Sequence, residues 1–409
     1  MNDSTNLTPR REFWILLTLA GIQFTHIVDF MVMMPLGPEF TRIFSISDAQ
    51  FGLLISAYTF AAGFSGLLSS LYVDRFSRKR LLLILYALFA VATLACGLAP
   101  TYETLMAARI AAGTFGGVLS ALSQTMVADL IPFERRGRAM GIVMSSFSLA
   151  TVLGVPLSLF LAAHLSWHAP FIAIALVSVV LMLVAWQTLP PLAGHIQHQR
   201  GSPWDGIRKV VSDPQHLKAF AFAGLLVFAA FTVIPYITLY NTTNAGMTAQ
   251  QIPYIYLYGG LATLVSARWI GRLADSKGKV VMYRRMAVAA MLPILLITLT
   301  AGLPVWGIYM VGAVLFFCMS GRMIPGMALV TSACQPHLRG TFMALVSSVQ
   351  SAAMGVAAFI GGHIISRDAQ GMVVHYWMCA VIAIVAGVAS VWLAPQLRLY
   401  NAPSAHGSK

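Results

Sequence analysis

The sequence has 409 residues, of which 58% are hydrophobic and only 10% carry a charged side chain. A soluble globular domain has about 25% charged residues, so this composition excludes an ordinary soluble protein and indicates a chain that crosses a membrane many times. The formal charge of +13 would suggest nucleic-acid binding in a soluble protein. We expect no nucleic-acid partner here, because of where the basic residues lie between the apolar segments.

Long apolar stretches run through the whole sequence. A spanning helix needs about 20 mostly apolar residues, and continuous runs of this length favour helices over the short alternating segments of a membrane β-barrel. We therefore predict an all-α polytopic membrane protein embedded in the lipid bilayer. The twelve predicted spans are residues 13–37, 49–72, 80–98, 103–128, 138–162, 167–190, 218–241, 247–272, 283–302, 303–330, 339–363 and 371–395.

Positive charge lies mainly on one side of these spans. Most of the 26 Lys and Arg residues fall in the two tails and in the loops that follow even-numbered spans. Only Arg42 and Arg367 fall in loops on the other side, while Arg109, Arg268 and Arg322 lie inside helices. Cytoplasmic loops of membrane proteins carry an excess of Lys and Arg. We predict a multi-pass protein of the plasma membrane (the inner membrane of a bacterium) with both termini cytoplasmic.

The first predicted span holds the one acidic residue at membrane depth, Asp29, with His26 three residues before it. A charged side chain at the bilayer centre costs about 2.5–3.5 kcal/mol on insertion scales. Desolvation disfavours the charged carboxylate, so a buried aspartate can exchange a proton near neutral pH. We predict that Asp29 couples transport to protons or binds a cation, with His26 as a relay. The alternatives are a static ion pair for Asp29 and a helix-packing role for His26.

Two short polar segments recur in the chain at nearly the same spacing. LYVDRFSRKR is similar to GRLADSKGKV, and their aspartates, Asp74 and Asp275, are 201 residues apart. The pairs Arg136-Gly137 and Arg339-Gly340 are 203 residues apart. Two markers at one offset near half the chain length indicate an internal repeat.

This repeat predicts two halves joined by a linker. We expect an N-terminal six-helix bundle at 1–190 and a C-terminal six-helix bundle with a short cytoplasmic tail at 218–409. The segment 191–217 is rich in Gly, Pro and basic residues, as expected for a cytoplasmic linker. Secondary transporters are often built from such repeats, with the substrate site near the midplane between them.

The loop after the second span reads Ser70-Leu-Tyr-Val-Asp74-Arg75-Phe-Ser77-Arg78-Lys79. It is similar to the G-x-L-x-D-R-x-G-R-[RK] pattern of the major facilitator superfamily, with serines in place of both glycines. The fourth span contains ARIAAGTFGG, similar to the family's R-x-x-x-G element, and ends in DLIPFERRG. The chain resembles this superfamily over nearly its full length, which implies twelve helices in two pseudo-symmetric bundles.

The charged residues of these loops are predicted to form a cytoplasmic gate. A carboxylate at a membrane edge with cationic neighbours can lock adjacent helices in one conformation and release them in another. The alternative is that the basic loops only fix the orientation in the membrane. The predicted gate residues are Asp74, Arg75, Arg78, Asp129, Arg136 and Asp275.

The fifth span contains Gly154-Val155-Pro156. This is similar to the G-x-x-x-G-P-x-x-G-G element of antiporters in the same superfamily, although a valine separates the Gly from the Pro. Gly and Pro in a spanning helix also allow close packing and a bend. The element favours efflux over uptake and gives the chain its resemblance to the twelve-helix drug:proton antiporter and sugar-efflux group.

Two arginines inside predicted helices are candidates to pair with Asp29. Arginine stays charged in a protein, so inside a membrane it must face a cavity, water or a carboxylate. Arg109 lies in the same half as Asp29 and Arg322 in the other half, and both pairings remain open. Arg322 is also a candidate anion site or an anchor to backbone carbonyls. The predicted substrate cavity comprises Gln23, Arg109, Arg322, Tyr236 and Tyr240.

We predict a proton-coupled secondary transporter that exports small organic molecules, such as drugs or metabolites, by alternating access. We expect a monomer whose partners are a small-molecule substrate and protons. The alternatives are a symporter or facilitator of an anionic metabolite, an exporter of lysolipid or siderophore, and a non-transporting receptor on the same fold. We expect no enzymatic activity, no cofactor and no metal, because no nucleotide-binding loop lies in a soluble domain and the four cysteines lack CxxC spacing.

Overall fold

The structure is a computed structural model that describes residues 8–72, 76–131, 133–190, 203–335 and 338–400. Long helices dominate it. In the first half they are α1 (Pro9–Val32), α2 (Gly37–Ile43), α3 (Asp48–Tyr72), α4 (Arg78–Gly97), α5 (Tyr102–Leu130), α6 (Phe133–Leu149), η2 (Ala150–Gly154), α7 (Val155–His164) and α8 (His168–Thr188).

The rest of the described chain is also helical, apart from one short hairpin. Its elements are α9 (Pro203–Val211), α10 (Pro214–Phe231), η4 (Ile234–Tyr236), α11 (Ile237–Asn244), α12 (Ile252–Lys277), α13 (Lys279–Ile297), α14 (Val305–Ser332), α15 (Arg339–Ile364), β1 (Ser366–Arg367), β2 (Val373–Val374), α16 (Tyr376–Leu393) and η6 (Ala394–Gln396). The two strands pair antiparallel, with Ser366 opposite Val374.

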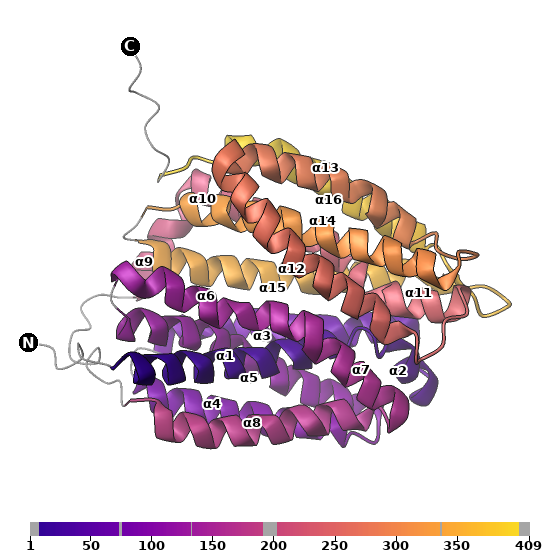
Figure 1. Cartoon of the computed structure of the whole chain (residues 1–409), viewed down its shortest axis with the longest axis horizontal. Coiled ribbons are helices and arrows are strands. Elements are labelled where there is room, and N and C mark those ends of the chain that lie inside the picture. Colours follow the sequence, from indigo (N-terminus) through magenta and orange to yellow (C-terminus); the bar gives the residue numbers. More distant parts are fainter. Residues whose placement is uncertain (1–7, 73–75, 132, 191–202, 336–337, 401–409) are drawn as a thin grey trace, which may run out of the picture.

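The all-α membrane fold predicted from the sequence is confirmed. Within the described residues, eleven helical stretches are long and apolar enough to cross a membrane. The remaining long helix, α12, has 26 residues and runs alongside the others (Figure 1). It is less apolar because it is rich in tyrosine and glycine at its start and charged at its end. Together these stretches correspond to the twelve predicted spans.

Proline interrupts three of the predicted spans. Proline has no N–H to donate, and it disfavours helical geometry in the residue before it. The first span therefore ends at Val32, ahead of Pro35, and the chain turns into α2. The fifth span contains a π-helical segment, η2, directly before Pro156. The seventh contains a 3₁₀ turn, η4, around Pro235.

The helices form two bundles in the order of the sequence. Helices α1–α8 lie together, and α10–α16 lie above them in Figure 1. We call one end of the molecule the α9 end, because α9 lies there with the start of α1 and the end of α16. The opposite end carries α2, α11 and the β hairpin and is called the hairpin end. The predicted linker 191–217 contains α9, but residues 191–202 lie outside the described chain, so its boundaries stay a prediction.

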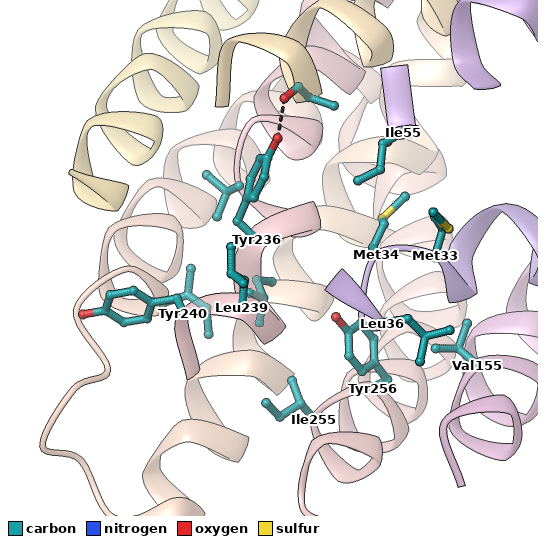
Figure 2. Close-up of a cluster of buried hydrophobic side chains, with 14 of the residues drawn as sticks. Met33, Met34, Leu36, Ile55, Val155, Tyr236, Leu239, Tyr240, Ile255 and Tyr256 are labelled. Carbon is teal, nitrogen blue, oxygen red and sulfur yellow. Dashed lines mark hydrogen bonds between the residues drawn. The ribbon is translucent and has the colours of Figure 1, made fainter. Parts of the chain in front are cut away.

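Buried apolar side chains form three clusters. One belongs to the first half and one to the second half. The third joins both halves, packing Met33, Met34 and Val155 of the first half with residues of the second such as Tyr236 and Tyr256 (Figure 2). Its first-half members lie mainly towards the hairpin end, so the two bundles share one apolar core there.

Candidate functional site

Asp29 and Arg109 form an ion pair inside the first half. Arg109 Nη1 donates to Asp29 Oδ2 at 3.0 Å and lies 3.4 Å from the Asp29 carbonyl oxygen. Both side chains are fully buried. They come from α1 and α5, which pack against each other. Of the two pairings that the sequence left open, the structure contains the one between Asp29 and Arg109.

This ion pair uses only part of the hydrogen-bonding capacity of its two side chains. Asp29 Oδ1 and the Nε and Nη2 atoms of Arg109 are buried and have no hydrogen-bond partner among the described residues. Instead, the Arg109 guanidinium lies over the ring of Tyr58, 4.1 Å from its centroid. A cation over an aromatic face is stabilised by the ring quadrupole, so Tyr58 from α3 is a third member of the site. Sequence analysis did not select it.

Gln23 and His26 lie on α1 within two turns of Asp29. Gln23 Nε2 donates to Ser120 Oγ of α5 at 3.0 Å. The His26 ring stacks on Tyr58 and meets Phe89 edge-on, and its two ring nitrogens are buried without a hydrogen-bond partner in the described chain. No hydrogen bond joins His26 to Asp29 in the described structure, so its predicted relay role remains a prediction, while its packing contacts are plain.

An aromatic stack connects this site to the other half. Phe30, the residue after Asp29, stacks on Tyr58 with ring centroids 5.2 Å apart. Phe30 also stacks on Phe231 of α10, with centroids 5.8 Å apart. Tyr58 is therefore two aromatic contacts away from the second bundle, and a movement between the halves would reach it through Phe30.

Arg322 is a buried cation of the second half. Its Nη2 donates to the carbonyl oxygen of Leu226 in α10 at 3.0 Å, and only 2% of the residue is exposed. No salt bridge joins it to an acid of the described chain. The backbone anchor considered from the sequence is thus present, although the carbonyl belongs to the neighbouring helix rather than to the turn around Pro325. The remaining guanidinium donors keep the predicted anion site open as a proposal.

Tyr236 and Tyr240 lie at the hairpin end rather than around the ion pair. The Tyr236 hydroxyl donates to the carbonyl oxygen of Ala358 (Figure 2). Its ring edge contacts Phe51 of the first half, and Tyr240 packs against Tyr376. Tyr236 thus stands at the contact between the halves, and the structure does not bring these tyrosines together with Asp29 and Arg109.

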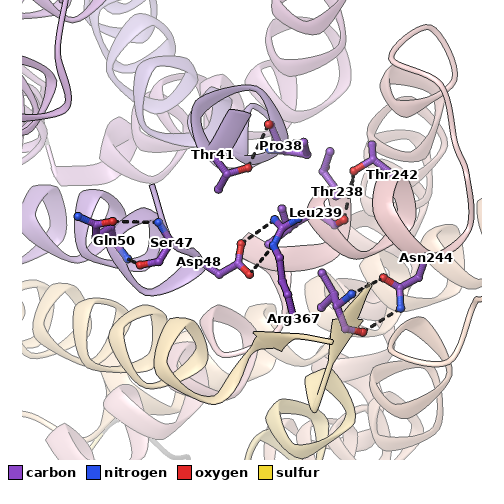
Figure 3. A network of polar contacts seen from close by, with 11 residues as sticks. Pro38, Thr41, Ser47, Asp48, Gln50, Thr238, Leu239, Thr242, Asn244 and Arg367 are labelled. Atoms are coloured by element: carbon purple, nitrogen blue, oxygen red, sulfur yellow. Dashed lines mark hydrogen bonds and ion pairs between the residues drawn. The ribbon is translucent and has the colours of Figure 1, made fainter. Parts of the chain in front are cut away.

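A second ion pair joins the two halves at the hairpin end. Arg367 of β1 donates to both carboxylate oxygens of Asp48, the first residue of α3, at 2.9 and 3.1 Å (Figure 3). The Asp48 side chain is 4% exposed and that of Arg367 39%. Ser56 Oγ, further along α3, donates to the Gly355 carbonyl of α15 at 2.8 Å. We call these two links the hairpin-end latch.

The Gly154-Val155-Pro156 element also lies between the halves. Gly154 packs against Val28 and Phe24 of α1, where an added Cβ would clash. The π segment η2 before Pro156 lies against Gly260 of α12, where an added Cβ would be 2.9 Å from the Thr151 carbonyl oxygen. The element therefore performs the close packing expected from its sequence, and it does so partly across the interface between the bundles.

The structure describes only some of the predicted gate residues. Arg78 Nε donates to Asp129 Oδ2 at 3.3 Å and ties α4 to α5 at the α9 end. Both residues belong to the first half. Asp275 is exposed at the end of α12. Asp74 and Arg75 lie outside the described residues, as does the side chain of Arg136, so the gate stays a prediction.

Comparison with known proteins places the chain among polytopic membrane transporters. The family model of the Major Facilitator Superfamily matches residues 19–358. The chain therefore belongs to the major facilitator superfamily, as its motifs predicted. This family consists of transporters, which confirms the prediction that the chain is not an enzyme.

Relatives and solved structures agree with this assignment. A "Probable sugar efflux transporter" of Pasteurella multocida (strain Pm70) is 21% identical over 360 residues, covering 88% of this chain and 87% of the relative. A nucleoside transporter structure superposes with a TM-score of 0.75 at 12% identity, covering 94% and 99% of the two chains. A D-xylose-proton symporter gives 0.72 at 16% identity, covering 93% and 96%. At these identities, the structures show a shared fold.

Proposed function

We propose that this chain is a proton-coupled exporter of small organic molecules that works by alternating access as a monomer. The α9 end, with both termini, would face the cytoplasm and the hairpin end would face outwards, as the positive-inside pattern suggests. The membrane would be the bacterial inner membrane. Sugars are the first substrate class to test, because the relative from Pasteurella multocida is described as a sugar efflux transporter.

The buried Asp29–Arg109 pair is the observation that carries the proposal. A protonated Asp29 would no longer balance Arg109, and an unpaired cation inside a membrane protein is costly. Proton binding would therefore destabilise the present arrangement and favour one in which Arg109 reaches water or substrate. Loss of the proton would restore the ion pair, so the pair can convert a proton gradient into a change of conformation.

Contacts between the halves support the alternating-access part of the proposal. The hairpin-end latch holds the bundles together on the proposed outer side, and the stack of Phe30 on Tyr58 and on Phe231 links Asp29 to the second half. A movement of Asp29 or Arg109 would therefore displace these rings and change the contact between the two halves. Export rather than uptake is supported by the likeness of Gly154-Val155-Pro156 to the antiporter element and by the description of the relative from Pasteurella multocida as an efflux transporter.

Uptake or facilitated transport of an anionic metabolite is the second candidate. It is favoured by Arg322, a buried cation with no ion-pair partner in the described chain, which donates to a backbone carbonyl instead. An anion entering between the bundles could replace that carbonyl as the acceptor. Substitution of Arg322 by glutamine would then abolish stabilisation by organic acids while leaving stabilisation by sugars intact.

The test measures ligand-induced thermal stabilisation of the purified protein. A ligand raises the unfolding temperature by binding the native state, and we would compare a panel of sugars, cationic drugs and organic acids at about pH 6 and about pH 8. If protonation and substrate binding exclude each other, an exported ligand stabilises the wild type more at the higher pH. Asp29→Asn should remove this pH dependence.

A double variant separates coupling from stability. Removing one partner of a buried ion pair typically destabilises a protein by about 3–5 kcal/mol, because the other charge is left unpaired. Asp29→Asn with Arg109→Gln removes both charges and should recover much of that stability while still lacking the pH dependence. Retained pH dependence in the double variant would remove the ion pair from the mechanism, and a pH-independent wild type would contradict proton coupling.

A further inference from the structure

Helices α13 and α16 lie on the side of the second half away from the first (Figure 1), and residues of both helices line a groove. It has a volume of about 570 Å³ near the α9 end. Its walls are mainly aliphatic, with Val281, Val288 and Val391 among them, and Arg284 and Arg285 also line it. Val281 and Val288 are well exposed, so this surface faces the bilayer.

The two arginines of this groove have no hydrogen-bond or ion-pair partner in the part of the chain that the structure describes. Both are exposed, and neither makes a hydrogen bond or an ion pair with another described residue. Arg284 and Arg285 lie five and six residues after Lys279, the first residue of α13. At 1.5 Å per residue, this is roughly 8–9 Å into the helix, from where the long arginine side chains can reach the level of the lipid headgroups.

The internal repeat shows that these arginines are not required by the fold. The repeat offset of 201 residues aligns the start of α13 with the start of α4, and it aligns Arg284 and Arg285 with Leu83 and Ile84. Ile84 is 59% exposed, so the first half presents an apolar side chain to lipid where the second half presents an arginine.

The corresponding helix pair of the first half binds one of its basic residues internally. Lys79 at the start of α4 donates to the carbonyl oxygen of Trp186 in α8 at 2.6 Å. In the second half, the adjacent arginines beside α16 are left for an external partner. The partner must be anionic at one end and apolar at the other, since Val288 and Ala289 continue the groove one turn further along α13, towards the membrane interior.

We propose that this groove binds one anionic two-chain phospholipid. Arg284 and Arg285 would hold its phosphate by charge-assisted hydrogen bonds, for which the planar guanidinium is well suited. The acyl chains would run from there past Val288 and Ala289 towards the membrane interior. Basic pockets between membrane helices are established sites for anionic headgroups, and the site is separate from the Asp29–Arg109 pair, so it stands whatever the transported substrate is.

The test is native mass spectrometry of the purified full-length protein titrated with phosphatidylglycerol or with phosphatidylcholine of the same chains. We expect one tightly bound phosphatidylglycerol and much weaker phosphatidylcholine binding. Arg284→Gln with Arg285→Gln should weaken phosphatidylglycerol binding roughly 30-fold, given the contribution of each arginine near an anionic lipid. Val288→Trp keeps both arginines but fills the groove, and it should weaken binding as well.

The matched control is Arg10→Gln with Arg11→Gln, which removes another adjacent, exposed pair of arginines at the α9 end. This variant should bind phosphatidylglycerol like the wild type. Equal loss in both double variants would reduce the effect to general surface charge and overturn the proposal. Unchanged binding in the Arg284 and Arg285 variant would do the same. Displacement of the bound lipid by millimolar glycerol 3-phosphate would instead show a site for a soluble anion, which also contradicts the proposal.

Discussion

Arg109 is held by two different interactions inside the first half. One of its nitrogens donates to Asp29, and the face of its guanidinium lies on the ring of Tyr58. The Tyr58 hydroxyl itself is buried and has no hydrogen-bond partner among the described residues. The ring of Tyr58, rather than its polar group, is therefore the part that stabilises the site.

This division of roles gives a prediction at Tyr58. Tyr58→Phe keeps the aromatic face and removes an unsatisfied hydroxyl, so the protein should unfold at the same temperature or a higher one. Tyr58→Leu removes the aromatic face and should destabilise the protein by about 0.5–2 kcal/mol through the lost cation–π contact alone. Thermal unfolding of the purified variants measures both. A hydroxyl-dependent role would reverse the order, with Tyr58→Phe as the damaging change.

At this scale the sequence identified the charges but not their surroundings. Asp29 stood out because it is a carboxylate within an apolar span, and Arg109 because it lies at a similar depth. Tyr58 carried no such signal, since tyrosine is common in membrane helices. The position of His26 three residues from Asp29 predicted nearness, yet its ring is occupied by Tyr58 and Phe89. Side-chain rotamers and packing determine which neighbouring residues touch, and the spacing of two residues along a helix does not determine it alone.

The fifth span changes its helical geometry where it meets the other bundle. Helix α6 passes into the π segment η2 and then into α7 at Pro156. π segments are rare and frequently occur at functional sites. Here η2 lies against Gly260 of α12, whose missing side chain allows the two backbones to approach closely. The close approach therefore depends on one glycine.

Substitution of this glycine should show the dependence. In Gly260→Ala, the new Cβ would lie 2.9 Å from both the Thr151 carbonyl oxygen and Val152 Cα, so the helices must separate. We expect a loss of about 1–3 kcal/mol, as for overpacked cores, and slower transport in proteoliposomes. Gly271→Ala, on the same helix, meets no atom within 4 Å and should be neutral or stabilising, because alanine favours helix. Equal effects at both sites would refute the role of this contact.

The sequence predicted the number and order of these elements well, since apolar length alone marks a spanning helix. It also placed a special feature at Gly154 and Pro156. It could not show that the irregular turn would be a π segment or that its partner would be Gly260, because η2 and α12 are far apart in the sequence. Such contacts are set by how the two bundles dock.

The two bundles are connected at the hairpin end by charge as well as by apolar packing. Arg367 was expected on that side of the membrane, but the chain separates it from Asp48 by 319 positions. Their pairing therefore emerged only from the fold. It unites the start of α3 with the hairpin after α15, so opening of this end must break it.

Loss of this ion pair should favour opening of the hairpin end. A partly exposed pair contributes at most about 1 kcal/mol, which corresponds to a shift of roughly fivefold in a two-state equilibrium. Spin labels at Thr41→Cys on α2 and Thr243→Cys on α11 would report the separation of the halves by electron paramagnetic resonance. Asp48→Asn should increase the population with the longer distance.

Two further variants control this measurement. Glu39→Gln breaks the exposed Glu39–Arg42 pair within α2, which does not join the halves, and should leave the distances unchanged. Asp48→Asn combined with Arg367→Gln should shift the equilibrium no further than the more disruptive single change, because the two residues act together. Additive shifts would mean that the two residues act separately and that their ion pair does not hold the hairpin end closed.

Between the bundles, several contacts of α3 with α15 have a glycine on at least one side. Gly52 lies beside Gly362, Gly63 beside Ser351 and Gly355 beside Thr59. Long side chains would have to interlock on closing and would each lose rotamer entropy, whereas glycine and serine lose little. Helices α3 and α15 can therefore slide past each other and separate with little change in side-chain entropy. Whether this interface opens or closes would then depend on the few polar contacts between the two helices rather than on the glycine contacts themselves.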